Sequence, residues 1–500
     1  MIIRDSNKIK KKIIKSDLSI IGSGISGIFL AYLLRNQNLK IYLIEKGNSK
    51  FKKKENLYVN KNIFHSGSFK EEGIKLGGKG NVWGGQLAEF SEQDIKKNNW
   101  GLSYNELKKL YKKVYQILKI KISNNPNNTD SKLIFEKFKV KRYFSYFLKT
   151  PSLYDYFYKE LRNYDNIEIY KNLSAVKLNF YAKNAENLEC KNSNNEKILV
   201  KANKFIFSMG TLENNRFFLN NQILKNNPIN KNKNIGKYFQ DHLGIVIGRL
   251  KIKSETNFRN YFENGIYNGT TYQPKIKSID KKQPIGISAE FHYKSKNDGR
   301  IFQIKKNIKN IRHNLNIKFL LNIFKDFKNI QILFEIFFYY LSKKRIKSYF
   351  DEKIDVYIQS EQIPISKSFL ELSRSKSKDN NYKLNVNWDI SNKELKSIKV
   401  FSKNLSQFLI NKKIGKIIFN KNLDNKRNFI KKLRDTNHPS GGLCIGNFGK
   451  GVCDKNMKLH NTKNVFIAGS SIFPNSSYAN TGLTILAMTL KLANYLKKIS

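Results

Sequence analysis

The chain has 500 residues, more than one hydrophobic core usually organises, so we expect two structural domains. Hydrophobic residues make up 40% of the chain and aromatic residues 13%, which excludes a largely disordered protein. The formal net charge is +54, but the lysines are spread along the whole sequence. A nucleic-acid-binding protein would concentrate its basic residues on one face or helix, so the spread favours an ordinary enzyme.

The first residues and the cysteines indicate a cytoplasmic protein. Residues 1–16 are basic, and we expect them to form a mobile arm. The apolar run at 18–21 is too short for a signal peptide or a spanning helix. The three cysteines, Cys190, Cys444 and Cys453, are odd in number and lack the spacing of a metal site. We therefore expect reduced thiols and no bound metal.

The pattern from residue 17 predicts a βαβ unit that binds a dinucleotide. Gly22, Gly24 and Gly27 form a G-x-G-x-x-G motif between an apolar strand and an apolar helix. These glycines permit the tight turn, the approach of the backbone to a pyrophosphate, and close packing of helix on strand. The helix N-terminus favours the phosphates, and Glu45, at the end of the second strand, can accept hydrogen bonds from ribose hydroxyls. This motif leaves FAD and NAD as alternatives.

The elements that follow alternate between helical and strand-like patterns. A glycine-dense segment at 76–87 precedes a helix with a capping box at Ser103 and Glu106. The apolar residues of this helix share one face: Leu107, Leu110, Tyr111, Val114, Tyr115 and Leu118. Short strands are expected at about 165–210, and a mixture of strands and helices at 245–435. The last sixty residues predict a strand, a glycine-rich turn and a helix at 483–496.

The region 315–341 is helical, apolar and basic, and it has two interpretations. It is either an insert with one buried face or an amphipathic element that touches anionic lipid. Peripheral membrane contact is therefore one alternative for this protein.

The segment 77–85, GGKGNVWGG, resembles the second glycine motif of the glucose–methanol–choline (GMC) family of flavin oxidoreductases. In that family the motif wraps the flavin. The resemblance implies FAD contacts for five residues of the motif: Gly77, Gly78, Asn81, Trp83 and Gly84. Val82 stands where some members carry the His that binds FAD covalently, and valine has no nucleophilic atom. We therefore expect non-covalent FAD.

Four later segments resemble the same family, in the same order along the chain. Residues 205–219, with Gly210 at the turn, resemble the strand that returns to the FAD domain, and 234–242 resemble the segment that leaves for the substrate domain. Residues 361–364, followed by 372–373 and Asp379, resemble a strand pair of the substrate domain. The block from His438 through Gly469 to Asn480 follows the C-terminal block of the family.

The resemblance implies an α/β fold, in which a Rossmann-like FAD-binding domain is joined to an α+β substrate domain with an antiparallel sheet. We expect the FAD-binding domain at 17–244, with a lid-like helical segment at about 90–160, and the substrate-binding domain at 245–434. Residues 435–500 then return to the FAD domain.

The resemblance also assigns the catalytic pair. Oxidation of an alcohol by hydride transfer needs a base for the hydroxyl proton and a group that holds the oxygen. In the family these roles fall to a His and to a second His or Asn, which correspond to His438 and Asn480. The implied cofactor contacts at this end are Gly469, Asn480 and Thr481, and the following helix would stabilise negative charge on the reduced flavin. Thr481 replaces the family's usual Pro, so we expect an altered helix cap.

Two other histidines are lesser candidates, and neither is assigned a catalytic role. His242 is expected to be a hydrogen-bonded structural residue. His65 lies in a loop rich in Ser and Gly, and the sequence suggests no partner for it.

The sequence thus predicts an FAD-dependent oxidoreductase that acts on the CH–OH group of a small alcohol or sugar-like substrate. The electron acceptor is left open between oxygen, a quinone and a protein. A flavin monooxygenase or an NAD-linked reductase would share the region 22–45 but would leave the terminal block unexplained. A nucleic-acid-binding protein is supported by the charge alone.

Overall fold

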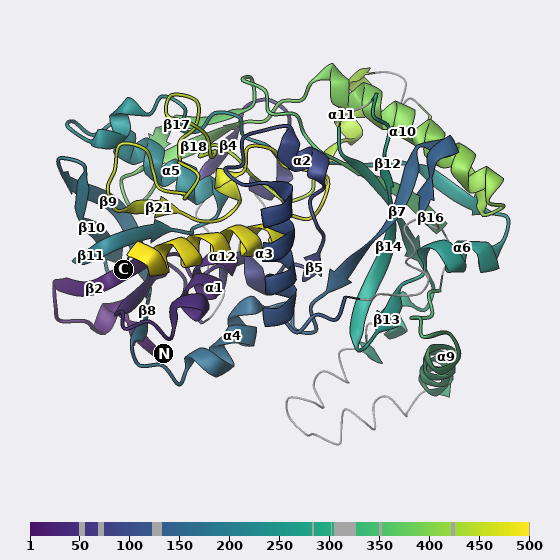
Figure 1. The fold of residues 1–500 in the computed structure, drawn as a ribbon, viewed down its shortest axis with the longest axis horizontal. Coiled ribbons are helices and arrows are strands. Elements are labelled where there is room, and N and C mark those ends of the chain that lie inside the picture. The colour runs from purple at the N-terminus through teal and green to yellow at the C-terminus, as the bar shows by residue number, and fades with distance from the viewer. Residues whose placement is uncertain are drawn as a thin grey trace.

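The computed structural model describes residues 1–49, 56–68, 75–122, 133–282, 285–301, 303–304, 327–349, 353–421 and 426–499. Two large β-sheets lie beside each other in Figure 1, one on the left and one on the right. The predicted α/β class, with a Rossmann-like part and a second, antiparallel part, is confirmed by these sheets.

The first sheet is mainly parallel. Its strand order is β1-β8-β3-β2-β11-β10-β9, and β21 also pairs with β11. The strands are β1 (Ile2–Asp5), β2 (Ile13–Ile21), β3 (Ile41–Ile44), β8 (Ile167–Lys171), β9 (Leu173–Tyr181), β10 (Asn184–Asn192), β11 (Lys197–Phe207) and β21 (Val465–Ile467). Because β21 pairs in parallel with the end of β11, the last part of the chain joins the sheet that the first part begins.

The expectation of a mobile arm at residues 1–16 is wrong. Strand β1 pairs in parallel with β8, and β2 already begins at Ile13. The N-terminal ammonium of Met1 donates to the carbonyl oxygen of Leu161 at 2.7 Å. The sequence pattern did not predict this strand, because the residues that pair with the first five lie more than 150 positions later in the chain.

Helices from three parts of the chain pack beside the first sheet. These are α1 (Ile25–Leu34), α3 (Tyr104–Ile117), α4 (Leu153–Leu161) and α12 (Gly482–Ile499). Helix α1 contacts both α12 and α4, and α12 contacts α3, which stands between the two large sheets in Figure 1. The predicted capping box of Ser103 and Glu106 is confirmed, and Leu107, Tyr111, Val114, Tyr115 and Leu118 are buried while Leu110 is partly buried. Two further helices are α2 (Glu92–Lys96) and α5 (Thr211–Gln222).

The second sheet is antiparallel, with the order β19-β12-β16-β15-β14-β7-β5. Its strands are β5 (Gln86–Leu87), β6 (Ile134–Phe135), β7 (Val140–Phe147), β12 (Leu243–Ile252), β13 (Gly265–Tyr267), β14 (Thr270–Ser278), β15 (Ile287–Lys294), β16 (Lys353–Ser360), β19 (Gly415–Phe419) and β20 (Arg434–Asp435). Helix α10 (Asn392–Asn411) contacts β7, β16 and β19. Two shorter helices are α6 (Glu255–Phe262) and α11 (Lys426–Lys432).

The expected strand pair at 361–364 and 372–379 has a different arrangement. Glu361 follows the end of β16 in the second sheet, whereas residues 372–373 lie in β17 (Phe369–Lys376). Strand β17 belongs to a small third sheet with β18 (Tyr382–Asn387) and β4 (Tyr58–Asn60). Residues 361–364 therefore form no strand, and only residues 372–373 belong to a sheet.

The surface features agree only partly with the expectations. Helix α9 (Phe327–Lys343) covers the second half of the predicted helical region, and its first part at 315–326 lies outside the described residues. No helix among the described residues is long and apolar enough to cross a membrane.

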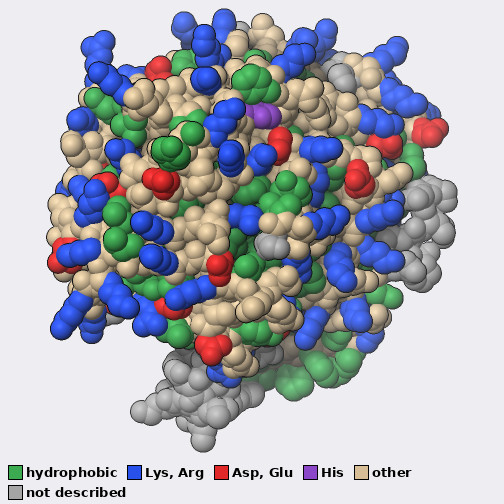
Figure 2. All heavy atoms as spheres, turned by 60° about the vertical axis from the view of Figure 1, so that its left-hand side comes forward, with side chains coloured by type: hydrophobic (Ala, Val, Ile, Leu, Met, Phe, Trp, Pro, Cys, Tyr) green, Lys and Arg blue, Asp and Glu red, His purple; other side chains and the backbone are tan. Residues whose placement is uncertain are grey.

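The three cysteines are free. On the face shown in Figure 2, lysine and arginine side chains are scattered rather than gathered in one stripe.

Candidate functional site

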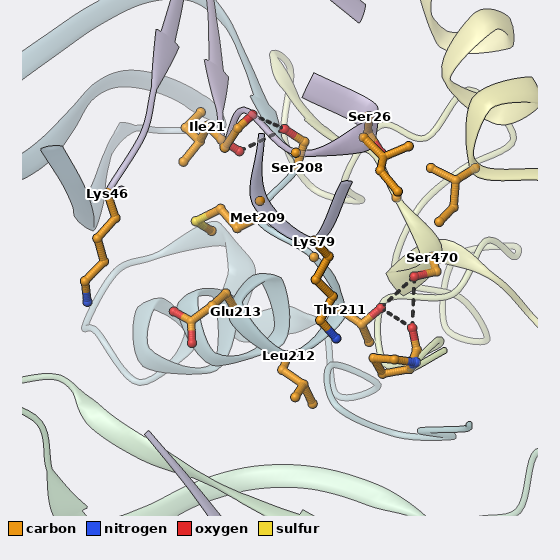
Figure 3. A pocket seen from close by; sticks show the side chains of 18 of the residues that line it. Ile21, Ser26, Lys46, Lys79, Ser208, Met209, Thr211, Leu212, Glu213 and Ser470 are labelled. Atoms are coloured by element: carbon orange, nitrogen blue, oxygen red, sulfur yellow. Dashed lines mark hydrogen bonds between the residues drawn. The ribbon is translucent and has the colours of Figure 1, made fainter. Parts of the chain in front are cut away.

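A pocket lies where the first glycine motif, the second glycine motif and the C-terminal block meet (Figure 3). One group of lining residues follows the parallel strands, including Gly22, Gly24 and Glu45. A second group comes from the end of the chain, including His438 and Asn480. The pocket therefore brings together residues that are more than 400 positions apart.

At two of its three glycines, the first glycine motif is packed too tightly for a side chain. Gly22 has a φ of +100°, and a Cβ there would lie 2.7 Å from the carbonyl oxygen of Ser208. A Cβ on Gly27 would lie 2.0 Å from the carbonyl oxygen of Gly22. Gly27 does not line the pocket; it lets α1 approach the turn, as the motif predicts.

The N-terminus of α1 faces this turn with the properties of an anion site. Its cap is Gly24, which supplies no side-chain hydrogen bond, and the first turn contains no acidic residue. The free N–H groups and the helix dipole therefore favour a phosphate at this position. Gly78 contributes to the same place, because a Cβ on it would lie 3.3 Å from the Cα of Gly24.

Glu45 is held in one orientation by its neighbours. Its Oε2 accepts hydrogen bonds from the N–H of Ser23 at 2.9 Å and from the Ser23 hydroxyl at 2.7 Å. Its Oε1 accepts from the N–H of Gly47 at 2.7 Å. The carboxylate lines the pocket at the carboxyl end of β3, where a ribose can reach it.

The second glycine motif is fastened to the first motif and to α12. The N–H of Gly77 donates to the Ser23 hydroxyl at 3.0 Å. The Trp83 indole N–H donates to the carbonyl oxygen of Pro151, and the ring lies so close to Gly482 that a Cβ there would be 2.2 Å from it. Trp83 therefore joins the glycine loop to the start of the last helix.

The structure separates the predicted cofactor residues into two groups. Those that line the pocket are Gly22, Gly24, Glu45, Gly78, Trp83, Gly210, Gly469, Asn480 and Thr481. Those that do not line it are Gly27, Gly77, Asn81 and Gly84. Asn81 instead donates from its amide to the carbonyl oxygen of Leu76 at 2.6 Å, so it shapes the loop. Val82 also lies outside the pocket lining and is 60% exposed.

Several lining residues escaped the sequence reasoning. The side chains of Lys46 and Lys79 come into the pocket from different segments (Figure 3). Ser208 also lines it, and its hydroxyl donates to the carbonyl oxygens of Ile21 at 3.0 Å and Gly22 at 2.8 Å. Lysine is so abundant in this chain that the sequence did not single out Lys46 and Lys79. The position of Ser208, directly after a buried strand, could have indicated that it lines the pocket.

His438 and Asn480 meet in the pocket, as the resemblance implied that they would. The Asn480 side-chain amide lies 3.3 Å from Nε2 of His438. On the other side of the ring, Nδ1 lies 2.8 Å from the Thr436 hydroxyl. With Nδ1–H donating to Thr436, Nε2 is the unprotonated nitrogen and accepts from the amide. In this tautomer Nε2 is a base that faces the pocket.

His242 lies beside His438, with ring centroids 4.9 Å apart, but its nitrogens are both engaged. Its Nε2 is 2.8 Å from the carbonyl oxygen of Ser476, to which it must donate. Its Nδ1 then accepts from the Gln359 amide at 2.6 Å. The expectation of a satisfied structural histidine is confirmed. Of these two neighbouring rings, only His438 lines the pocket, where its Nε2 meets the amide of another lining residue, Asn480.

His65 has a buried partner, which the sequence did not identify. Its Nε2 lies 2.9 Å from Oδ2 of Asp241, and both side chains are fully buried. The other oxygen of Asp241 accepts from the backbone N–H of His438 at 3.0 Å and of Thr436 at 3.4 Å. Asp241 therefore links His65 to the turn that carries the candidate base.

Asp435 lies close enough to His65 and Asp241 for the three to share a cation. Its Oδ1 accepts from the N–H and hydroxyl of Ser66 at 2.6 Å, and its Oδ2 accepts from the N–H of Gly67 at 2.8 Å. Because N–H or O–H donors engage the oxygens of both carboxylates, the donor set fits a hydrogen-bonded anchor better than a metal site.

The residue after His438 is fixed by two hydroxyls. The carbonyl oxygen of Pro439 accepts from Thr211 at 2.7 Å and from Ser470 at 2.9 Å. Figure 3 labels the two residues that donate these bonds. The turn that follows requires glycine at two positions, Gly441 and Gly442, whose φ angles are +80° and +85°. The segments that carry Thr211 and Ser470, together with the glycine turn, thus determine where the His438 imidazole lies.

The surroundings keep the candidate base neutral. Burial is the main cause that holds the pKa of His438 well below its ordinary value. Its neighbour His242 and the ammonium groups of Lys79 and Lys275 act in the same direction. A neutral imidazole at neutral pH is the form that can take a proton.

Comparisons with known proteins agree with this arrangement. Residues 364–489 match the family model described as GMC oxidoreductase, and residues 20–50 match that of the NAD(P)-binding Rossmann-like domain. No curated protein matches the chain in sequence.

Two solved structures share the fold over nearly their whole length. Pyridoxine 4-oxidase from Mesorbium loti is similar with a TM-score of 0.61 at 13% identity, over 96% of this chain and 99% of that chain. A formate oxidase variant from Aspergillus oryzae RIB40, studied for FAD modification, gives 0.59 at 12% identity, over 97% of this chain and 98% of that chain.

The site at the carboxyl ends of the parallel strands, the paired His438 and Asn480, and the two family models lead to one assignment. The C-terminal part of this chain, residues 364–489, thus matches the GMC oxidoreductase family, and the chain is an FAD-dependent oxidoreductase that acts on CH–OH donors.

Proposed function

We propose that this protein oxidises a CH–OH group of a small alcohol or sugar-like molecule, with His438 as the base. The observation that carries the proposal is the contact between Asn480 and Nε2 of His438 inside the pocket that the glycine motifs also line. Nε2 takes the proton of the substrate hydroxyl, and the Asn480 amide donates a hydrogen bond to the oxygen that becomes negative. Bound FAD supplies the acceptor for the hydride.

The residues of the pocket fit FAD at three points. The start of α1, with Gly22 and Gly24, would hold the pyrophosphate, and Glu45 would accept from the ribose. Thr481, directly before α12, would place backbone N–H groups near the anionic edge of the ring system. Val82 offers no atom for a covalent link and is directed to solvent, which supports non-covalent binding.

The fixed tautomer of His438 supports its role as base. Thr436 accepts the Nδ1 proton, so the unprotonated nitrogen is directed at Asn480 rather than at the protein interior. When Nε2 takes the substrate proton, both ring nitrogens carry hydrogen, and Thr436 can still accept. The ring can therefore keep its orientation during the step, while the Asn480 amide turns its N–H from Nε2 to the substrate oxygen.

Replacement of His438 tests the proposal. The variant His438→Ala should purify with yellow flavin bound, yet substrate should reduce that flavin about a hundredfold to ten-thousandfold more slowly than in the wild type. The measurement is loss of flavin absorbance after anaerobic mixing. Unchanged reduction by the same substrate would remove His438 from the role of base.

The substrate for this measurement comes from a screen of sugars, polyols, aromatic alcohols and hydroxylated lipids with a dye acceptor. Repeating the screen under air alone, and with a soluble quinone, identifies the electron acceptor. If no CH–OH compound reduces the flavin while reduced nicotinamide does, the proposed function is wrong and a reductase takes its place.

A further inference from the structure

Helix α9 (Phe327–Lys343) exposes a continuous apolar stripe. Phe334, Phe337, Phe338 and Leu341 are spaced at i, i+3, i+4 and i+7, so they share one helical face. Their exposed fractions are 57%, 54%, 61% and 47%, respectively. Phe327, two turns before Phe334, falls on the same face and is 78% exposed. Single exposed apolar residues are ordinary, but a stripe along about four turns needs an explanation.

The opposite face of α9 attaches the helix to the body of the protein. Ile332 is buried, and the Tyr339 hydroxyl donates to Glu263. Glu335 accepts from Lys347 at 2.7 Å and from the Tyr349 hydroxyl at 2.8 Å. The orientation of the helix is therefore fixed by these contacts, and the apolar stripe is directed away from the body. In Figure 1 the helix lies at the lower right edge of the molecule, outside the second sheet.

The charges around the stripe match an anionic surface. Glu335 is the acidic residue of α9, and it is directed inward to its partners. Exposed lysines stand at both ends of the helix, with Lys328 at the start and Lys343 and Lys344 at the end. A second copy of this chain would fit poorly, because each copy carries a formal net charge of +54.

We propose that α9 is a docking surface for a lipid membrane with anionic headgroups. The aromatic stripe enters the boundary between headgroups and acyl chains, and the net positive charge of the chain attracts the anionic headgroups. The protein lies on the bilayer without crossing it. This surface is separate from the FAD pocket, so the proposal is independent of the proposed function.

The test compares the triple variant F334S/F337S/F338S with the wild-type holoenzyme in vesicle sedimentation. Wild type should bind vesicles made of equal parts phosphatidylcholine and phosphatidylglycerol, and salt should weaken the binding. The triple variant should lose at least about tenfold in partition coefficient, because the apolar contribution is removed. Its flavin absorbance should be retained, which shows that it folds.

The control is Tyr181→Ser, which removes a 75% exposed aromatic residue from β9 in the other sheet. It should bind vesicles as the wild type does. Equal binding by the triple variant would overturn the proposal, because charge alone would then explain the attraction. Absence of wild-type binding at moderate salt would also overturn it, as would a wild-type dimer that the triple variant fails to form.

Discussion

The two ends of the pocket are built in different ways. At the nucleotide end, the turn at Gly22, the start of α1 and Glu45 come from one continuous stretch of about thirty residues, as is usual for a βαβ unit. At the catalytic end, His438 is positioned by Asp241, Asn480 and the carbonyl contact of Pro439 with Thr211. The first site is local in sequence, whereas the second is assembled from distant segments.

This difference determines what each site tolerates. The nucleotide end depends on close backbone contact at Gly22 and Gly27, so an added side chain at either position disturbs it. The catalytic end depends on hydrogen bonds between side chains, so the loss of a donor or an acceptor disturbs it. Substitutions at the two ends should therefore differ in kind, the first reducing cofactor content and the second reducing rate.

The largest effect is expected at Gly27. In Gly27→Val, the new side chain meets the carbonyl oxygen of Gly22, which is 2.0 Å from an ideal Cβ. The turn that receives the pyrophosphate cannot keep its shape, so the protein should purify without FAD or fail to fold. The ratio of flavin to protein absorbance measures this. The matched control is Gly299→Ala, where nothing lies within 4 Å of the added Cβ, and it should stay yellow. A yellow Gly27→Val protein would contradict this account of the turn.

A smaller effect is expected at Asn480, which acts on rate rather than on cofactor content. Asn480→Ala removes the amide that reaches Nε2 of His438. A hydrogen bond to a developing charge contributes about 1.5–3 kcal/mol, so flavin reduction should slow about tenfold to a hundredfold. Asn480→His restores a donor and should recover part of the rate in stopped-flow measurements. Equal rates in the alanine variant and the wild type would show that Asn480 only lines the pocket.

Asp241 should affect the reaction indirectly, by holding the backbone of His438 in position. Asp241→Asn weakens the buried contact with His65 and leaves a poorer acceptor for the backbone N–H of His438. Disturbing such a buried pair costs about 1–3 kcal/mol of unfolding free energy, measured as a lower Tm of the holoenzyme. The pH dependence of flavin reduction should change as well, because His438 is less firmly held. A lower Tm with an unchanged pH profile would assign Asp241 to stability alone.

The smallest effect is expected from pH between neutrality and mild acidity. The pKa of His438 lies well below its ordinary value of 6.5, so the base stays neutral as the pH falls through that value. Flavin reduction should therefore remain flat there and decline only at lower pH. Because the unfolded state binds a proton first, stability contributed by this site also falls as the pH drops below 6.5. A rate that halves near pH 6.5 in the wild type but not in a His438 variant would contradict this.

The same contrast explains what could be predicted from sequence. The turn at Gly22, the capping box of Ser103 and the final helix depend on neighbouring residues, and their patterns predicted them correctly. The strand at residues 2–5 was missed, because its partner β8 lies some 165 residues later. The partner of His65 was missed for the same reason, since Asp241 becomes its neighbour only when the chain folds.

Family resemblance supplied what local pattern could not. It brought His438 and Asn480 together before any geometry was known, whereas spacing alone could not. It also assigned FAD contacts to Gly77, Asn81 and Gly84, which shape a loop without lining the pocket, so their contact with the cofactor stays a prediction. Contacts made by glycines and amides within a loop depend on three-dimensional packing that a motif does not specify.

The most direct test of the central claim is a crystal structure of the yellow holoenzyme. Our account predicts that the adenine nucleotide lies along Glu45 and the start of α1, and that the isoalloxazine ring lies beside His438 and Asn480. A flavin bound in the reverse direction, or a ring far from the imidazole of His438, would contradict it.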